Sequence, residues 1–576
     1  MSTWHVPGGT AGEITLIRTN LAAAREADED CPLGRSLEAR PLVTADPKAP
    51  ELTLPLADFA LGPLMAALDR IEFPRFGLSQ TEVLSLMWQT HGTFKNRRRA
   101  PAHPGLLKWT ELAISHYLTA RQADQAARLA AGKPTTRPVD VKWVIQRQLS
   151  QPDARGARTY EQTAWGRRYT SADGEVRELW LLSFGRAKTE RPAGETAAAA
   201  KVTMFGGSAV GGWKAPHEMT PARRPQTGEP KHPSRARVID VGCADGSFSV
   251  LADWSRTQVD DNFAADAAPV LSRVVGDMQT KPGSSCLDCK AITGCTVLPR
   301  TPGLLSLTAG HPSGRRMSMS VSDLRYYEDC PAKYHILRQL KLKSTRPESN
   351  AIRRGRAVDA WLNERHADRD RTACRAQSGP DVSVWLADRF SLPPVDADAA
   401  ARMAAHHGWF CPLDGLSTSE KVLIQPQITC FDHELNLVFT ATPDLVHSRD
   451  GGWIWRETKT SASKLFEGKP LLRQYPQLAL AVLMLNAGAL GGIVVRSRVE
   501  LELLTPDDVT LEEIDPARPA VVDEARQVID DLAKPWIRDT AYEPQPGAAC
   551  ASCEALDWCQ PGQDHVGDTE NLNGER

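Results

Sequence analysis

The segment TATPDLVHSRDGGWIWRETKT, residues 440–460, has the pattern of a β-hairpin with charged residues at one end, and the predicted fold rests on it. An apolar arm after Asp444 leads to an Asp-Gly-Gly turn, and the Trp-Ile-Trp that follows is typical of a strand. Residues two apart on a strand point to the same face, so Glu457 and Lys459 share a face. The hairpin brings Asp444 beside them, which predicts three converging charged side chains.

This predicted group of charges suits a divalent cation. The carboxylates of Asp444 and Glu457, with the backbone carbonyl of Thr458, form a hard oxygen site of the kind that Mg²⁺ or Mn²⁺ prefers. The ammonium of Lys459 can orient an attacking water or offset charge that develops on a phosphodiester. Because charges without a partner are costly beside Trp and Leu, we expect a hydrolytic metal site rather than a hairpin that carries only surface charges.

The cysteines form two similar groups. Three of the 12 cysteines follow the spacing C-x2-C-x5-C near the middle of the chain, and three more repeat it near the end, each after Pro-Gly and two small residues. A Glu-Asp-Cys-Pro segment precedes each triad by more than two hundred residues. Such self-similarity indicates two related units in tandem. The expected quartets are Cys31, Cys286, Cys289 and Cys295, and Cys330, Cys550, Cys553 and Cys559.

Four thiolates are the ligand set of a [4Fe–4S] cluster. We expect such a cluster in the second unit and a second one in the first. Zinc stays open as an alternative, because His565 follows the last triad, although zinc ribbons normally combine two local C-x2-C pairs. The other cysteines are isolated in sequence and are expected to be core residues: Cys243, Cys374, Cys411 and Cys430.

Length and composition describe a multidomain chain of ordinary character. It has 576 residues, 41% hydrophobic and 24% charged, with a formal net charge of −2. Neither a secretory signal nor an apolar run long enough for a bilayer is evident, so we expect a cytoplasmic protein without a membrane partner, in which thiols stay reduced. With little net charge, contacts to nucleic acid are expected from local basic patches. The candidates are Lys95, Arg97, Arg98, Arg99, Arg353 and Arg354.

The repeat and the polar segments suggest domain boundaries. The first unit is expected at residues 10–297 and the second at 317–560. Residues 298–316 are expected to form a linker, and the polar residues 561–576 a disordered tail.

A Pro-Asp pair, a Glu-x-Lys after a short hairpin and cysteines arranged one plus three occur together in residues 318–560. In this combination the region resembles the RecB-like branch of the PD-(D/E)XK nucleases, and most of all its iron–sulfur members, the AddB-type nuclease domains and the CRISPR-adaptation exonucleases. The resemblance implies an α/β fold with a mixed sheet flanked by helices, a divalent-metal site, cleavage of DNA and a structural cluster.

Two positions depart from the pattern of the family that the region resembles. The family has a histidine metal ligand in a helix soon after the first cysteine, and here Asp359 stands at that point and is expected to take its role. The family also has Gln-x3-Tyr after the Lys. Gln477 matches the Gln and is a candidate catalytic residue, whereas Ala481 occupies the place of the Tyr.

The first unit resembles the same fold without its chemistry. When its Asp-Gly turn is placed on that of the second unit, Arg167, Trp180 and Leu182 take the positions of Asp444, Glu457 and Lys459. We therefore expect two tandem restriction-endonuclease-like units, each closed by a cysteine-ligated cluster, of which the first is a degenerate pseudo-nuclease that grips DNA. The basic loop with Arg223 and Arg224 is expected to contribute to this grip.

These features predict a divalent-metal-dependent deoxyribonuclease, acting as an exonuclease at single-stranded ends in DNA repair, recombination or phage defence. The alternative is a catalytically weak or inactive DNA-binding or scaffold subunit that partners a separate helicase or nuclease. Since the chain carries no helicase motif, a motor encoded separately is a plausible partner under either interpretation.

Overall fold

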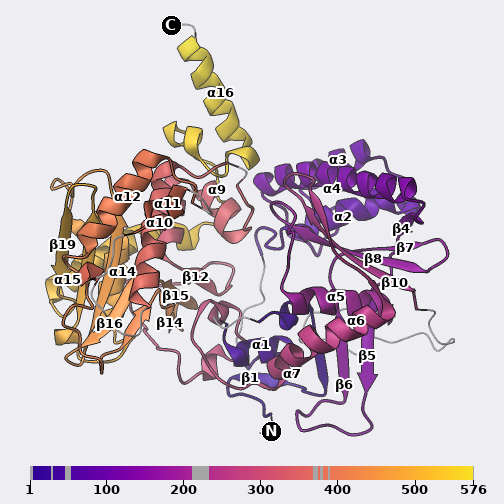
Figure 1. Ribbon diagram of the computed structural model, residues 1–576, viewed down its shortest axis with the longest axis horizontal. Coiled ribbons are helices and arrows are strands. Elements are labelled where there is room, and N and C mark those ends of the chain that lie inside the picture. Colours follow the sequence, from indigo (N-terminus) through magenta and orange to yellow (C-terminus); the bar gives the residue numbers. More distant parts are fainter. Residues whose placement is uncertain are drawn as a thin grey trace.

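The structure, a computed structural model, describes residues 4–26, 30–45, 54–209, 232–344, 346–367, 374–376, 380–386 and 390–574. The chain forms an N-terminal lobe, residues 4–297, and a C-terminal lobe, residues 298–574, which lie side by side (Figure 1). Both lobes contain sheets of mixed strand direction flanked by helices, so the predicted α/β fold class is confirmed. Within the described residues, no helix has the length and apolar character that crossing a bilayer requires.

The C-terminal lobe is built on two sheets. Its strands are β12 (Met317–Met319), β13 (Val422–Ile424), β14 (Ile428–Asp432), β15 (Leu437–Ala441), β16 (Leu445–Arg449), β17 (Gly452–Thr460), β18 (Arg498–Leu504) and β19 (Val509–Ile514). The main sheet has the order β13-β16-β17-β18-β19, with β17 and β18 parallel and the other neighbours antiparallel. The smaller sheet has the order β12-β15-β14, with β12 parallel to β15.

The N-terminal lobe repeats this strand arrangement. Its strands are β1 (Thr10–Gly12), β2 (Leu16–Thr19), β3 (Leu42–Thr44), β4 (Thr136–Pro138), β5 (Trp143–Gln148), β6 (Thr159–Thr163), β7 (Arg167–Ser171), β8 (Val176–Ser183), β9 (Gly207–Ser208), β10 (Arg235–Gly242) and β11 (Phe248–Ser255). The main sheet runs β4-β7-β8-β10-β11, again with one parallel pair, β8 and β10, in the same place. The sheet β2-β6-β5 matches β12-β15-β14, β9 is added at its edge, and β1 pairs with β3.

The helices of the C-terminal lobe are α8 (Val321–Asp329), α9 (Pro331–Tyr334), α10 (Asn350–His366), α11 (Val382–Leu386), α12 (Pro394–His407), α13 (Leu471–Gln474), α14 (Pro476–Asn486), α15 (Pro519–Arg538) and α16 (Gln560–Gly574). They cover its sheets, except for α16, which contacts the short turns around the final cysteine triad and projects away from the lobe (Figure 1). The apolar helix α14 is almost wholly buried between the sheet and α15. On the other side, α10 and α12 pack together over β17 and β18.

The N-terminal lobe has helices of its own. They are α1 (Pro32–Glu38), α2 (Leu61–Glu72), α3 (Gln80–Gln89), α4 (Pro104–Ala130), α5 (Ala193–Phe205), α6 (Arg256–Asn262) and α7 (Ala268–Gly276). Trp109 and Tyr117 of α4 pack on Trp180 and Ile239 of the main sheet. The alanine-rich helix α5 packs against the sheet in a separate core.

Each cysteine triad lies at the boundary with the opposite lobe. In the N-terminal lobe, Cys286 packs against Phe431 of β14 and Val438 of β15. In the C-terminal lobe, Ala555 and Trp558, which stand between its cysteines, join the core that contains α2 and α4. The two lobes are therefore joined through both triads, and neither triad faces only its own sheet.

The segment predicted as a linker, residues 298–316, packs on the C-terminal lobe. Leu304 and Leu305 are buried in its main core. The backbone N–H of Ser306 donates to Asp530 Oδ1 of α15 at 3.0 Å. A chain of several leucines can bury apolar area against a neighbouring helix, so this connection is a packed part of the lobe.

The segment predicted as a disordered tail, residues 561–576, is helical where the structure describes it. Helix α16 runs from Gln560 to Gly574. Proline just inside its start has the fixed φ that a first turn needs. Within the helix, Gln560 Nε2 donates to Asp564 Oδ1 at 2.8 Å, and Thr569 Oγ1 donates to the carbonyl of His565 at 2.8 Å. Polar composition led to the prediction of disorder, whereas side-chain contacts one turn apart support the helix.

Candidate active site

The predicted hairpin is present as β16 and β17, joined by a two-residue turn. Asp450 and Gly451 have φ of 53° and 81°, the left-handed values of the tight turns that fit the twist of a hairpin. The turn sets a pairing register in which Asp444 lies just before β16, opposite Glu457. Local turn chemistry therefore brings the two carboxylates to the same end of the hairpin.

The predicted charged residues converge. Lys459 Nζ lies 3.1 Å from Asp444 Oδ2 and 3.0 Å from Glu457 Oε2, and it donates a hydrogen bond to each. The backbone N–H of Thr458 donates to Asp444 Oδ2 at 2.6 Å, and Trp455 Nε1 donates to Glu457 Oε1 at 3.1 Å. Both carboxylates are therefore held in fixed orientations by donors from β17.

Burial and like charge shift the ionisation of this group. Burial raises the pKa of Glu457, and Asp444 raises it further, against the opposing effect of Lys459. Burial also raises the pKa of Asp359, with Asp444 as the next cause. Burial alone would lower the pKa of Lys459, but Glu457 and Asp444 outweigh it and raise this pKa. Burial and the neighbouring carboxylate thus disfavour the ionised forms of Glu457 and Asp359, an effect that a nearby cation would offset.

A cavity of about 490 Å³ lies between α10 and the ends of β16 and β17. Asp359 of α10 lines it together with Asp444, Thr458 and Lys459. The side-chain amide of Gln425 donates to both carboxylate oxygens of Asp359, at 3.1 and 3.0 Å. Asp359, at the position where the family that this region resembles has a histidine, therefore lines the same cavity as residues of the hairpin.

The residues present fit a divalent metal. Asp359, Asp444 and Glu457 supply three carboxylates against one ammonium, that of Lys459, so a doubly charged cation would offset the excess negative charge. All of these donors are oxygen, which Mg²⁺ and Mn²⁺ prefer over softer ligands. The carbonyl of Thr458 belongs to the same stretch of strand and would add a fourth oxygen.

Gln477 is placed differently from the residues above. It lies in the first turn of α14, is half-buried, and is not among the residues that line the cavity. Ala481, one turn later, is fully buried in the core beneath the sheet. A catalytic role for Gln477 therefore has no support from contact with the cavity.

The second cysteine quartet surrounds one small cavity. Cys330, from the junction of α8 and α9, lines it together with the three cysteines of the final triad. Backbone N–H groups point at the sulfurs: Gln545 N lies 3.4 Å from Cys330 Sγ, and Gly547 N lies 3.4 Å from Cys550 Sγ. Residues more than two hundred positions apart in the chain are thus brought to one point.

The first quartet has the same arrangement. Cys31 and the three cysteines of the middle triad line a cavity of about 100 Å³. The N–H groups of Gly34 and Lys281 donate to Cys31 Sγ at 3.5 and 3.4 Å, and that of Gly283 donates to Cys286 Sγ at 3.4 Å. Hydrogen bonds from backbone N–H groups to sulfur are a common feature of thiolate-ligated clusters.

The basic candidates fall into two classes. Those after α3 are all exposed, namely Lys95, Arg97, Arg98 and Arg99. In α10, by contrast, Arg353 donates to the carbonyls of Phe390 and Ser391, at 3.4 and 3.1 Å, and Arg354 forms an ion pair with Asp396 of α12 at 2.8 Å. Their guanidinium groups hold α10 in place, which argues against the predicted contact with nucleic acid.

Arg356, nearby on α10, lines the active-site cavity and pairs with Glu348 at 2.8 Å. It is a better candidate for a contact to substrate than Arg353 or Arg354. The predicted basic loop with Arg223 and Arg224 lies outside the described residues.

One group of side chains was missed by sequence reasoning. Cys374 and Cys411, predicted to be isolated core residues, lie together with His366 and His407. The available signal was the spacing His-x3-Cys at the end of α12, which alone is too short to identify a site. The second pair of this group comes from a different helix and segment.

Comparison with known proteins agrees with this geometry. Residues 318–560 match the family model described as the PD-(D/E)XK nuclease superfamily. Residues 318–560 therefore form a PD-(D/E)XK nuclease superfamily domain, and members of this superfamily are generally metal-dependent nucleases. A search of curated proteins found no match.

Chains of solved structures also match. One, described as "Crystal structure of SSO0001", is 16% identical and covers 36% of this chain and 96% of its own, with a TM-score of 0.20. A score of this size carries no argument about fold or function.

Proposed function

We propose that the C-terminal lobe is a divalent-metal-dependent deoxyribonuclease that acts as an exonuclease on single-stranded ends, in repair, recombination or phage defence. The observation that carries the proposal is that Asp359, Asp444 and Lys459 line one cavity, where the ammonium of Lys459 also holds the carboxylate of Glu457. A surface hairpin with incidental charges would not place a buried carboxylate, Glu457 at 6% exposure, beside two others.

In this proposal Asp359, Asp444, Glu457 and the carbonyl of Thr458 hold Mg²⁺ or Mn²⁺. The bound ion supplies Lewis-acid stabilisation of the phosphodiester oxygens. Trp455 and the N–H of Thr458 keep the two hairpin carboxylates aligned. Lys459, whose side chain is 34% exposed, keeps its ammonium at the cavity, where it orients the attacking water and offsets charge on the phosphate.

We also propose that each cysteine quartet holds a structural [4Fe–4S] cluster. A tetrahedral zinc ion, with Zn–S bonds of about 2.3 Å, would bring its sulfurs to about 3.8 Å from one another. Among the described residues, neither quartet forms a group whose ligand atoms all lie within 4.8 Å. The wider spacing supports the larger cluster, and the backbone N–H groups that face the sulfurs are the expected partners of its thiolates.

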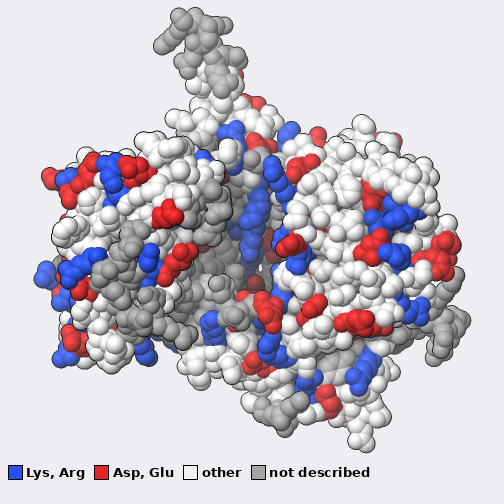
Figure 2. Space-filling view, viewed as in Figure 1, with Lys and Arg blue, Asp and Glu red and all other residues white. Residues whose placement is uncertain are grey.

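The N-terminal lobe is proposed to be a pseudo-nuclease that grips DNA. Figure 2 shows Lys and Arg side chains along the furrow between the lobes. Lys343 of the C-terminal lobe lies near Gly185 of the N-terminal lobe, where a Cβ would meet it at 3.5 Å. The side chain of Arg186, which follows Gly185, is 90% exposed and lies 3.5 Å from Asp245. Side chains of this kind hold phosphates by charge and without sequence preference.

The test is cleavage of single- and double-stranded DNA labelled at the 5′ or the 3′ end, with Mg²⁺ or Mn²⁺, by protein purified without oxygen. The proposal expects progressive shortening from an end of single strands, and none by Asp444→Ala. Intact DNA in both metals, beside measurable binding, would instead support the scaffold function. That second candidate is favoured by the aspartate at position 359 and by the loss of the charged group in the N-terminal lobe.

A further inference from the structure

Two histidines and two cysteines meet beneath the active site. His366 ends α10, Cys374 begins a short 3₁₀ helix, His407 ends α12, and Cys411 follows it four residues later. One ligand atom from each lies within 4.8 Å of those of the other three. All four side chains are buried, with exposures of 7%, 5%, 0% and 5% in the same order.

We propose that His366, Cys374, His407 and Cys411 bind one structural zinc ion. Two imidazoles and two thiolates are a common ligand set of structural zinc sites, in which no coordination position is left open. The Nε2 atoms of His366 and His407 face each other at 3.1 Å. Tetrahedral zinc with Zn–N bonds of about 2.0–2.1 Å would hold two nitrogens about 3.3 Å apart.

The groups around the four residues support ligation. His407 Nδ1 lies 2.8 and 2.9 Å from the two carboxylate oxygens of Glu502, which fixes the tautomer and leaves Nε2 for the metal. A carboxylate behind a ligating histidine is the usual partner of such a site. The backbone N–H of Cys374 donates to Cys411 Sγ at 3.3 Å. The sulfur therefore has a donor of the kind that stabilises a thiolate.

The site would fasten the helix that carries Asp359. Asp359 and His366 are seven residues apart on α10, which is two turns, so they share one face of the helix. His366 also lines the active-site cavity. On the opposite side, Glu502 of β18 accepts a hydrogen bond from Thr458 Oγ1 at 3.1 Å. An ion at this position would tie α10 and α12 to β17 and β18 and thereby position Asp359.

The zinc site does not depend on the nuclease proposal, so its test measures metal and not cleavage. Zinc and iron per chain are determined by mass spectrometry for the full-length protein and for Cys374→Ser and Cys411→Ser. The control is Cys430→Ser, at a fully buried cysteine of β14 outside the group. We expect the two variants to lose one zinc per chain relative to wild type and to keep its iron content, and the control to keep both metals.

A measurement on the wild type covers the case in which the variants do not fold. The native protein is alkylated with and without prior treatment by a zinc chelator, and modified cysteines are mapped by peptide mass spectrometry. Cys374 and Cys411 should react only after chelation, whereas Cys430 should stay protected in both samples. Wild-type protein without zinc would overturn the proposal and leave a hydrogen bond between His366 and His407. Equal labelling of Cys374 and Cys411 with and without the chelator would also overturn the proposal.

Discussion

The two main sheets have the same strand order but opposite environments at the equivalent ends of their hairpins. In the C-terminal lobe, Asp444 faces Glu457 and Lys459 beside an open cavity. In the N-terminal lobe, Arg167 pairs with Trp180 in the same register. The guanidinium of Arg167 forms ion pairs with Asp69 and Glu72 of α2.

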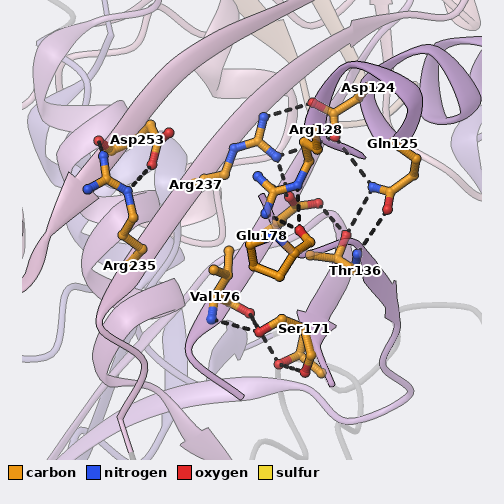
Figure 3. Close-up of polar contacts among 12 residues, drawn as sticks. Asp124, Gln125, Arg128, Thr136, Ser171, Val176, Glu178, Arg235, Arg237 and Asp253 are labelled. Atoms are coloured by element: carbon orange, nitrogen blue, oxygen red, sulfur yellow. Dashed lines mark hydrogen bonds and ion pairs between the residues drawn. The ribbon is translucent and has the colours of Figure 1, made fainter. Parts of the chain in front are cut away.

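The buried carboxylate of Glu178, inside the N-terminal lobe, is paired with arginines of the same lobe. Figure 3 shows Glu178 of β8 surrounded by Arg128 and Arg237, with Asp124 on the far side of Arg237. Glu178 also accepts hydrogen bonds from Thr136 and Trp180, at 2.9 and 3.2 Å. Such a closed network of paired charges has no need of an added cation.

Strand order therefore does not decide chemistry in this protein. One lobe turns carboxylates toward a cavity, whereas the other surrounds the buried carboxylate of Glu178 with guanidinium groups. Variants in each lobe test this difference.

The largest expected effect is on cleavage by Lys459→Ala. Removal of the only ammonium among three carboxylates should lower the rate about 10³-fold, or about 4 kcal/mol in activation free energy. Initial rates on labelled single-stranded DNA measure it. The matched control is Lys464→Ala, at a side chain that is 74% exposed and pairs with Asp508. Full activity of Lys459→Ala would refute the assignment of the active site.

The next effect is on stability, in Glu178→Ala. The change leaves Arg121, Arg128 and Arg237 buried without their shared carboxylate, so unfolding should become easier by about 3 kcal/mol. Urea unfolding measures it, with the exposed Glu13→Ala as control. Cleavage per folded molecule should stay unchanged. Cleavage lost from a folded Glu178→Ala would show that the two lobes share their chemistry.

A smaller effect is expected on DNA binding when Arg97, Arg98 and Arg99 are all changed to Glu. These side chains are exposed, so we expect affinity about ten-fold lower and a weaker dependence on salt. Titrations at several salt concentrations measure both, beside the control Lys534→Glu and Arg538→Glu, two exposed residues of α15. An unchanged affinity and salt slope would remove this loop from the DNA-binding surface.

The smallest effects concern the two hairpin turns. Gly451 and Gly174 have φ of 81° and 77°. The methyl group of an alanine at either position would meet no atom closer than 3.5 Å. Both Gly→Ala changes should therefore lower stability by about 1 kcal/mol through backbone strain alone. Thermal unfolding of each variant tests this. A much larger loss for one of them would show that its turn has a role beyond setting the register.

The residues that could be predicted from sequence are those placed by short-range rules. The turn at Asp450 and the alternation along β17 were sufficient to bring Glu457 and Lys459 to one face, because strand period and turn geometry act over a few residues. Both cysteine quartets were predicted as groups because the spacing recurs along the chain. Gln477 was predicted on resemblance alone, and it lies away from the cavity.

Which distant segments meet is settled by the packing of the whole chain. His366 and His407 come from the ends of two helices, Cys374 and Cys411 from the segments after them, and nothing local couples the first His–Cys pair to the second. The hairpin and its charged end could be derived from sequence alone, since each depends on neighbours in the chain. The cysteine quartets could be grouped because the same spacing occurs twice. The cavity, the pairing of Arg354 with Asp396 and the balance of charge in each lobe depend on how helices pack over the sheets, because packing is a property of the whole fold.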